Sequence, residues 1–128
     1  MSRLMMMTAA LSLFAPAWAL SREGQAAMDE GTKAQVRETI QQYVERDVQL
    51  KDAFLVLDPR TGEALRLAFD HVHAGVKPHE KGHLACVDFK GQTGKVYDVD
   101  IVAGKSQDGW RVTKVFLHKV EGKALDAK

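Results

Sequence analysis

The chain has 128 residues, of which 45% are hydrophobic and 27% are charged. These proportions are typical of a single globular domain and exclude a fibrous or disordered protein. Lys and Arg number 18 against 17 Asp and Glu, and the two signs alternate without a basic block. Nucleic acid and anionic membranes require a positively charged surface, so we expect neither as a partner.

The N-terminus has the features of an export signal. Arg3 supplies a positive charge, residues 4–14 are mainly apolar, and Ala17-Trp18-Ala19 matches a small-x-small cleavage motif. The apolar stretch is shorter than the roughly 20 residues that a membrane-spanning helix needs. We therefore expect a cleaved signal peptide over residues 1–19 and an exported protein, which would be periplasmic in a bacterium and otherwise secreted.

The rest of the chain divides into three expected parts. A flexible leader covers residues 20–31, a single α+β domain covers 32–121, and a polar tail covers 122–128. Cys86 is the only cysteine, so no internal disulfide can stabilise an exported domain. The domain must then be stable by packing alone, or with help from a metal ion, a protein partner or a homodimer.

The first expected element is an amphipathic helix over residues 33–51. Thr32 and Gln35 have the spacing of a capping box. Apolar residues then recur at helical spacing with polar residues between them. The apolar stripe consists of Val36, Ile40, Tyr43, Val44 and Val48. Such a stripe needs an apolar surface to pack on.

Beyond residue 52 the apolar period changes to 2, which indicates β-strands joined by turns. The connections are too short for helical crossovers, so the strands must form an antiparallel meander. The predicted fold is α+β, with one amphipathic helix packed on a curled meander sheet of four or five strands. Strands are expected at 53–57, 63–73, 83–89, 96–103 and 110–120, turns at 58–62, 91–94 and 104–109, and a loop at 74–82.

This order of elements over residues 32–120 resembles the cystatin-like and nuclear-transport-factor-like (NTF2-like) group of α+β folds, in which a curled sheet wraps on a helix. A long closing strand with the Trp-Arg-Val-Thr-Lys-Val run of residues 110–115 is common in such domains. The chain lacks the several N-terminal helices of the transport-factor type. The resemblance therefore favours the cystatin-like variant, and it implies a protein- or peptide-binding module rather than a deep catalytic pocket.

A cluster of four histidines predicts a metal site. His71 and His73 are two apart on a strand, so their rings leave one face about 6.5 to 7 Å apart at the backbone. His79 and His83 flank the following loop and can return as further ligands of Zn, Cu or Ni. Two alternatives remain open. The histidines can be incidental groups of a wet loop, or His71 and His73 can continue the apolar side of their strand and close the edge of the core.

Five residues are candidate additional ligands or polar-face groups: Cys86, Asp88, Asp98, Asp100 and His118. Cys86 can act as a small buried hydrophobe, a thiolate ligand or a redox-active thiol. The three aspartates share one face if the connection between their strands is odd in length or bulged. They would then bind a cation with His118, act as a general base, or form a solvated face.

The leading functional prediction is an exported, non-enzymatic binding domain that takes a transition-metal ion at the four histidines. No catalytic residue is assigned. One alternative is the cystatin-like protein- or peptide-binding module. The other is a small-molecule lyase or isomerase with an Asp or His base in a pocket between helix and sheet.

Overall fold

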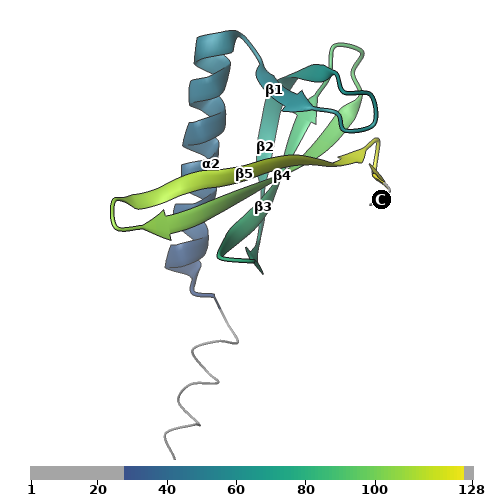
Figure 1. The fold of residues 1–128 in the computed structure, drawn as a ribbon. Helices are drawn as coiled ribbons and strands as arrows, with labels where there is room; N and C mark the ends of the chain where they lie inside the picture. The colour runs from purple at the N-terminus through teal and green to yellow at the C-terminus, as the bar shows by residue number, and fades with distance from the viewer. Residues whose placement is uncertain (1–27, 126–128) are drawn as a thin grey trace, which may run out of the picture.

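The computed structural model describes residues 28–125, which form one helix and a six-stranded sheet (Figure 1). The strands pair in chain order, each antiparallel to the next. The elements are α2 (Glu30–Lys51), β1 (Phe54–Leu57), β2 (Ala64–His79), β3 (Gly82–Lys90), β4 (Val96–Ser106), β5 (Gly109–Val120) and β6 (Lys123–Ala124). The predicted α+β meander is confirmed, with six strands instead of four or five and without strong curling.

Helix α2 begins at Glu30, three residues before its expected start. Asp29 is the N-cap, because its side chain accepts a hydrogen bond from the backbone N–H of Thr32 at 2.7 Å. That bond lowers the pKa of Asp29. Within residues 28–125 no helix is both long enough and apolar enough to span a membrane. The expected signal peptide and residues 20–27 of the leader lie outside the described residues.

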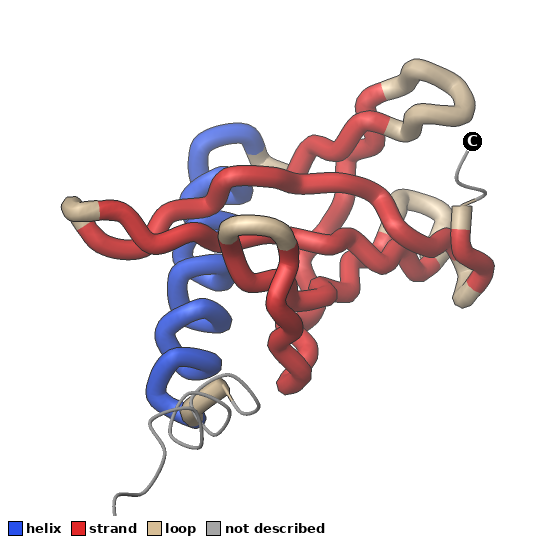
Figure 2. Tube along the Cα trace, turned by 60° about the horizontal axis from the view of Figure 1, so that its bottom comes forward, coloured by secondary structure: helices blue, strands red, loops and turns tan. Residues whose placement is uncertain are grey.

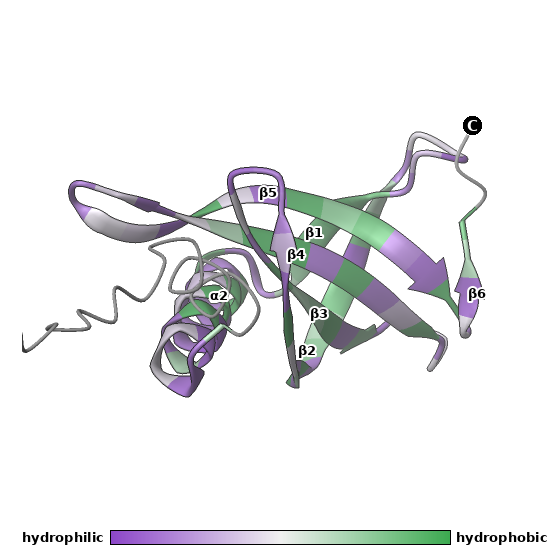
Figure 3. Ribbon diagram, turned by 90° about the horizontal axis from the view of Figure 1, so that it is seen from below, coloured by the Kyte–Doolittle hydropathy of each residue, from purple (hydrophilic) through white to green (hydrophobic). Residues whose placement is uncertain are grey.

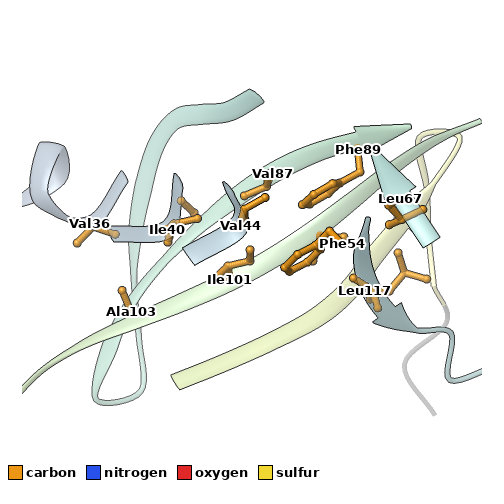
Figure 4. Close-up of a cluster of buried hydrophobic side chains, with 13 residues drawn as sticks. Val36, Ile40, Val44, Phe54, Leu67, Val87, Phe89, Ile101, Ala103 and Leu117 are labelled. Atoms are coloured by element: carbon orange, nitrogen blue, oxygen red, sulfur yellow. The ribbon is translucent and has the colours of Figure 1, made fainter. Parts of the chain in front are cut away.

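The apolar stripe of α2 packs on one side of the sheet, which we call the inner face (Figures 2 and 4). Val36, Ile40 and Val44 are fully buried there. At the centre of the core, the rings of Phe54 and Phe89 stack with their centroids 4.8 Å apart. The sheet adds Val56, Leu67, Ala85, Val87, Val99, Ile101, Ala103 and Leu117 to the same cluster. The side of the sheet away from α2 is the outer face (Figure 3).

Strand β2 continues through the stretch that was predicted to be a loop. It pairs with β3 as far as His79 and turns over at Glu80 and Lys81. The loop prediction is wrong, because ladder pairing with β3 outweighs the turn tendency of the glycine and proline within it. Gly82, just after the turn, marks a close approach of strands, since an added Cβ would lie 2.7 Å from the carbonyl oxygen of Ala103.

The expected polar tail also contains structure. Lys123–Ala124 form the short strand β6, which pairs with the end of β5. Leu125 packs against the core and donates its N–H to the carbonyl of His118 at 2.9 Å. The sheet therefore extends beyond residue 121.

The stacked aromatic pair gives a stability prediction. Phe89→Ala removes a fully buried ring, and we expect it to lower the free energy of unfolding by about 3 to 5 kcal/mol. The matched control is Leu57→Ala, at a strand residue that is 62% exposed, and it should change stability by less than about 0.5 kcal/mol. Urea denaturation followed by circular dichroism measures both. Equal losses in the two variants would contradict this description of the core.

Candidate functional site

The candidate ligands gather on the outer face. Polar and apolar residues alternate along β3, so Cys86 and Asp88 point away from α2. The connection at residues 91–95 is odd in length, and it pairs Asp88 with Asp98 and Cys86 with Asp100. A thiol and three carboxyl groups therefore share one side of two adjacent strands.

A β-bulge at Asp70 brings His71 to the same face. Phe69 and His71 pair with consecutive residues of β3, so Asp70 is an extra residue in β2. Strict alternation would have put His71 and His73 on the inner face with Phe69. The alternative in which they continue the apolar side is therefore wrong, because the bulge reverses the parity of the strand.

A second irregularity of β2 lies between Val72 and Val76, where the register shifts again. Arg37 of α2 donates a hydrogen bond from Nη1 to the carbonyl oxygen of Ala74 at 2.9 Å. The helix thus holds the irregular backbone that immediately follows the two histidines.

His71, His73 and Asp88 form the first ligand group. The two imidazole rings are parallel within 8°, with centroids 5.3 Å apart. Nε2 of His73 lies 2.8 Å from Oδ1 of Asp88, and Nε2 of His71 lies 3.7 Å from Oδ2. Ligand atoms from all three residues lie within 4.8 Å of one another, so the group could hold a metal ion.

Asp70 controls the orientation of His71. Its Oδ2 lies 3.3 Å from Nδ1 of the imidazole. A proton on Nδ1 that is donated to Asp70 leaves Nε2 unprotonated and facing Asp88. Histidines that bind metals commonly have such a carboxylate partner on the second ring nitrogen.

Asp88 and Asp98 affect each other's ionisation. Burial opposes the charge of Asp88, but hydrogen bonds with Asp98 and His73 and the charges of the nearby histidines outweigh it and lower the pKa of Asp88. The hydrogen bond with Asp88 is the main cause that raises the pKa of Asp98, and burial adds to it. Asp88 therefore loses its proton first, and the ionised carboxylate faces the imidazoles.

The structure does not bring the other two histidines to this group. His79 lies by the ring of Phe116, with centroids 6.1 Å apart. His83 meets Trp110 edge-on at 5.4 Å, and the indole N–H of that tryptophan bonds Gln35 of α2. Of the four predicted histidine ligands, only two converge, and Asp88 is the third member of their group.

Cys86, Asp100 and His118 form the second ligand group. The thiol donates to Oδ1 of Asp100 at 2.9 Å, and Nδ1 of His118 lies 3.2 Å from Oδ2. All three ligand atoms lie within 4.8 Å of one another. His118 reaches the outer face by ordinary alternation from Phe116, the partner of Asp100, at a position that the pairing of β5 with β4 skips.

Cys86 lies in an environment that keeps its thiol protonated. Burial, the hydrogen bond to Asp100 and the negative charge of that carboxylate raise the pKa of Cys86 to about 12. A nucleophilic or redox-active cysteine needs the opposite shift. The side chain is also a hydrogen-bond donor that is partly exposed, rather than a fully buried hydrophobe.

Sequence reasoning did not select Asp70, although a signal for it exists. The large apolar residues of β2 fall on odd positions up to Phe69 and on even positions at Val72 and Val76. A change of parity inside one strand indicates an extra residue between the two sets. The carboxylate beside His71 is that residue.

Comparisons with protein-family models, with curated proteins and with solved structures gave no match. No family is therefore identified for the chain.

The raised pKa of Cys86 leads to a prediction about its reactivity. Because only the thiolate reacts, the folded, metal-free protein at pH 8 should be alkylated by iodoacetamide about tenfold more slowly, or slower still, than the urea-unfolded protein. The alkylation rate should rise with pH well above 8. Mass spectrometry of quenched samples gives both rates.

Two variants test the cause. Asp100→Asn removes the nearest negative charge, lowers the pKa of Cys86 and speeds alkylation. Asp98→Asn is the matched control with a smaller effect, because the charge of Asp98 is the weakest of the causes that raise this pKa. Equal rates in folded and unfolded protein would refute the assignment.

Proposed function

We propose that the protein is an exported, non-enzymatic binding domain that takes a divalent transition-metal ion at His71, His73 and Asp88. The observation that carries this proposal is the position of the Asp88 carboxylate, which presents one oxygen to each Nε2 of two parallel imidazoles. Three ligands are thus supplied by two neighbouring strands, in which His71 pairs directly with Asp88 and His73 follows Val72, the last paired residue before the second register shift.

The separations suit a small metal ion. Two N or O ligands that each lie 2.0 to 2.1 Å from zinc, at a tetrahedral angle, are about 3.3 Å apart. The two measured separations, 2.8 Å at His73 and 3.7 Å at His71, lie on either side of this value. Small side-chain rotations are sufficient to form the site.

The donor set indicates which ions suit the site. Imidazole favours Zn²⁺, Cu²⁺ and Ni²⁺, and one carboxylate is compatible with each of them. The side chains of His71 and His73 are 58% and 42% exposed. An ion held there keeps an open position for water or for a ligand from solution.

Apolar side chains fill the space directly under α2, and thirteen of them are buried in one cluster. A concavity of about 430 Å³ lies beside this core, lined by Glu38 and Glu45 of α2 and by Val72 of β2. The lyase or isomerase alternative requires a concavity with a titratable group, so this groove would be its site. Export is supported by the pattern of the first nineteen residues.

The cystatin-like module is a second candidate function, favoured by the outer edge of the sheet. Strand β1 pairs with β2 alone among the described strands, so one of its edges is open. Leu55 and Leu57 on this strand are 37% and 62% exposed. An open strand edge beside exposed leucines can accept an extended peptide or a second copy of the chain.

Metal binding is tested with untagged protein in a Cys86→Ser background, which removes the thiol as a competing donor. We expect one Zn²⁺ per chain by native mass spectrometry and calorimetry. Changes to the residues around a metal's ligands lower metal affinity by roughly 10- to 100-fold. His73→Ala removes a ligand itself, so it should lower the affinity for Zn²⁺ by more than that. Asp70→Asn should fall within that 10- to 100-fold range, because it affects only the orientation of His71.

His79→Ala is the matched control, since it removes an imidazole that lies outside the group. It should leave zinc affinity unchanged. An equal loss in His79→Ala and His73→Ala would favour the four-histidine site instead. A protein that binds no zinc in any background would end the proposal and leave the peptide-binding module as the better candidate.

A further inference from the structure

We propose that Cys86, Asp100 and His118 form a second metal site, selective for a thiophilic ion such as Zn²⁺ or Cd²⁺. It lies on the same outer face as the first ligand group and shares no residue with it. This inference does not depend on the proposed function, because each group has its own donors.

The three donors come from three adjacent strands and converge on one volume. The contacts of Asp100 with Cys86 and His118 use different oxygens, at 2.9 and 3.2 Å. Sulfur, nitrogen and oxygen ligands of one zinc ion lie about 3.3 to 3.6 Å apart, given metal–ligand distances of 2.0 to 2.3 Å. The group therefore needs only a slight expansion to enclose an ion.

Burial of Asp100 favours a cation at this place. The residue is only 5% exposed, and among the described residues its ion-pair contact is with His118. A carboxylate removed from water requires a compensating positive charge. A divalent ion supplies more charge than one imidazole does. The negative charge that keeps the Cys86 thiol protonated would also attract the ion.

The ring nitrogen of His118 is a suitable free donor. Nδ1 is buried and makes no hydrogen bond within residues 28–125, although Oδ2 of Asp100 is 3.2 Å away. The separation is short but the direction is not that of a hydrogen bond. An ion between the thiol, the carboxylate and this nitrogen would give Nδ1 a partner.

The two groups are mononuclear sites rather than one binuclear centre. Cys86 and Asp88 are two residues apart on β3, so their backbone positions lie about 6.5 to 7 Å apart. Metal ions that act together on one substrate are about 3.5 to 4 Å apart. The ions should therefore bind independently, the thiol site preferring softer metals and the first group preferring borderline ones.

Cobalt is the probe that distinguishes the sites. The untagged, reduced full chain is stripped with a chelator and titrated with Co²⁺, because a thiolate bound to Co²⁺ produces a near-ultraviolet charge-transfer absorption that imidazole and carboxylate ligands lack. We expect this absorption at one Co²⁺ per chain. Cd²⁺ should displace the cobalt and abolish it.

Four variants distinguish the loss of this metal site from the loss of the first one. His118→Ala and Asp100→Asn should each weaken the absorbing site about tenfold or more, comparable to the loss of an important metal contact. His73→Ala should keep the absorption, which separates a failure of the first site from a failure of this one. His79→Ala is the imidazole control and should also keep it. Circular dichroism verifies that each variant folds.

Three results would overturn the proposal. The first is a wild-type protein without charge-transfer absorption at saturating Co²⁺. The second is an absorption that His118→Ala and Asp100→Asn leave unchanged, since Cys86 would then bind cobalt without the group. The third is an absorption that saturates at one Co²⁺ per two chains in His73→Ala, which would indicate a bridge between cysteines of different molecules.

Discussion

Within residues 28–125, helix α2 covers one face of the sheet, and this constraint determines which strand side chains must be apolar. Residues that face α2 must be apolar, because Val36, Ile40 and Val44 exclude water from the space between. Residues on the outer face meet solvent or one another. Polar groups are free to collect there, and the two ligand groups occupy that side of strands β2 to β5.

An interruption in regular pairing lies at each ligand group, but only the one in β2 changes the face of a histidine. The extra residue Asp70 changes the parity of β2, so His71 faces Asp88. His118 lies against Asp100 at a skipped position of β5, but ordinary alternation from Phe116 already places it on the outer face. In each case the regular central strands provide carboxylates at fixed positions, and an irregular flanking strand provides the imidazole. The first ligand group therefore depends on a local departure from the ladder.

The sequence was sufficient to predict the fold class, because apolar periodicity is a local property. Helical spacing identified the stripe of α2, and alternation identified β3 with Val87 and Phe89 on its buried side. The shared face of Asp88 and Asp98 was predicted only on condition of an odd or bulged connection, and the connection at residues 91–95 meets that condition. These inferences need only near neighbours in the chain.

The composition of the ligand groups could not be derived in the same way. Spacing alone made His79 and His83 look equivalent to His71 and His73, whereas the structure separates both from them along the β2–β3 hairpin and places His83 by Trp110, on the side of α2. The pairing of neighbouring strands decides which histidines lie close together, and the sequence of a single strand does not contain that information. The helix start shows the same limit, since either Asp29 or Thr32 satisfies the rules for a cap.

The bulge at Asp70 separates the alignment of β2 with β3 from the surroundings of His71, two properties that usually change together. The residues on either side of it already pair with consecutive positions of β3, so a chain without Asp70 would retain the same partners for Phe69 and His71. Loss or gain of this one residue would leave the strand alignment intact. It would, however, remove or supply the acceptor for Nδ1 of His71. A single-codon insertion or deletion could thus adjust the tautomer of an imidazole during evolution while the hydrophobic core stays the same.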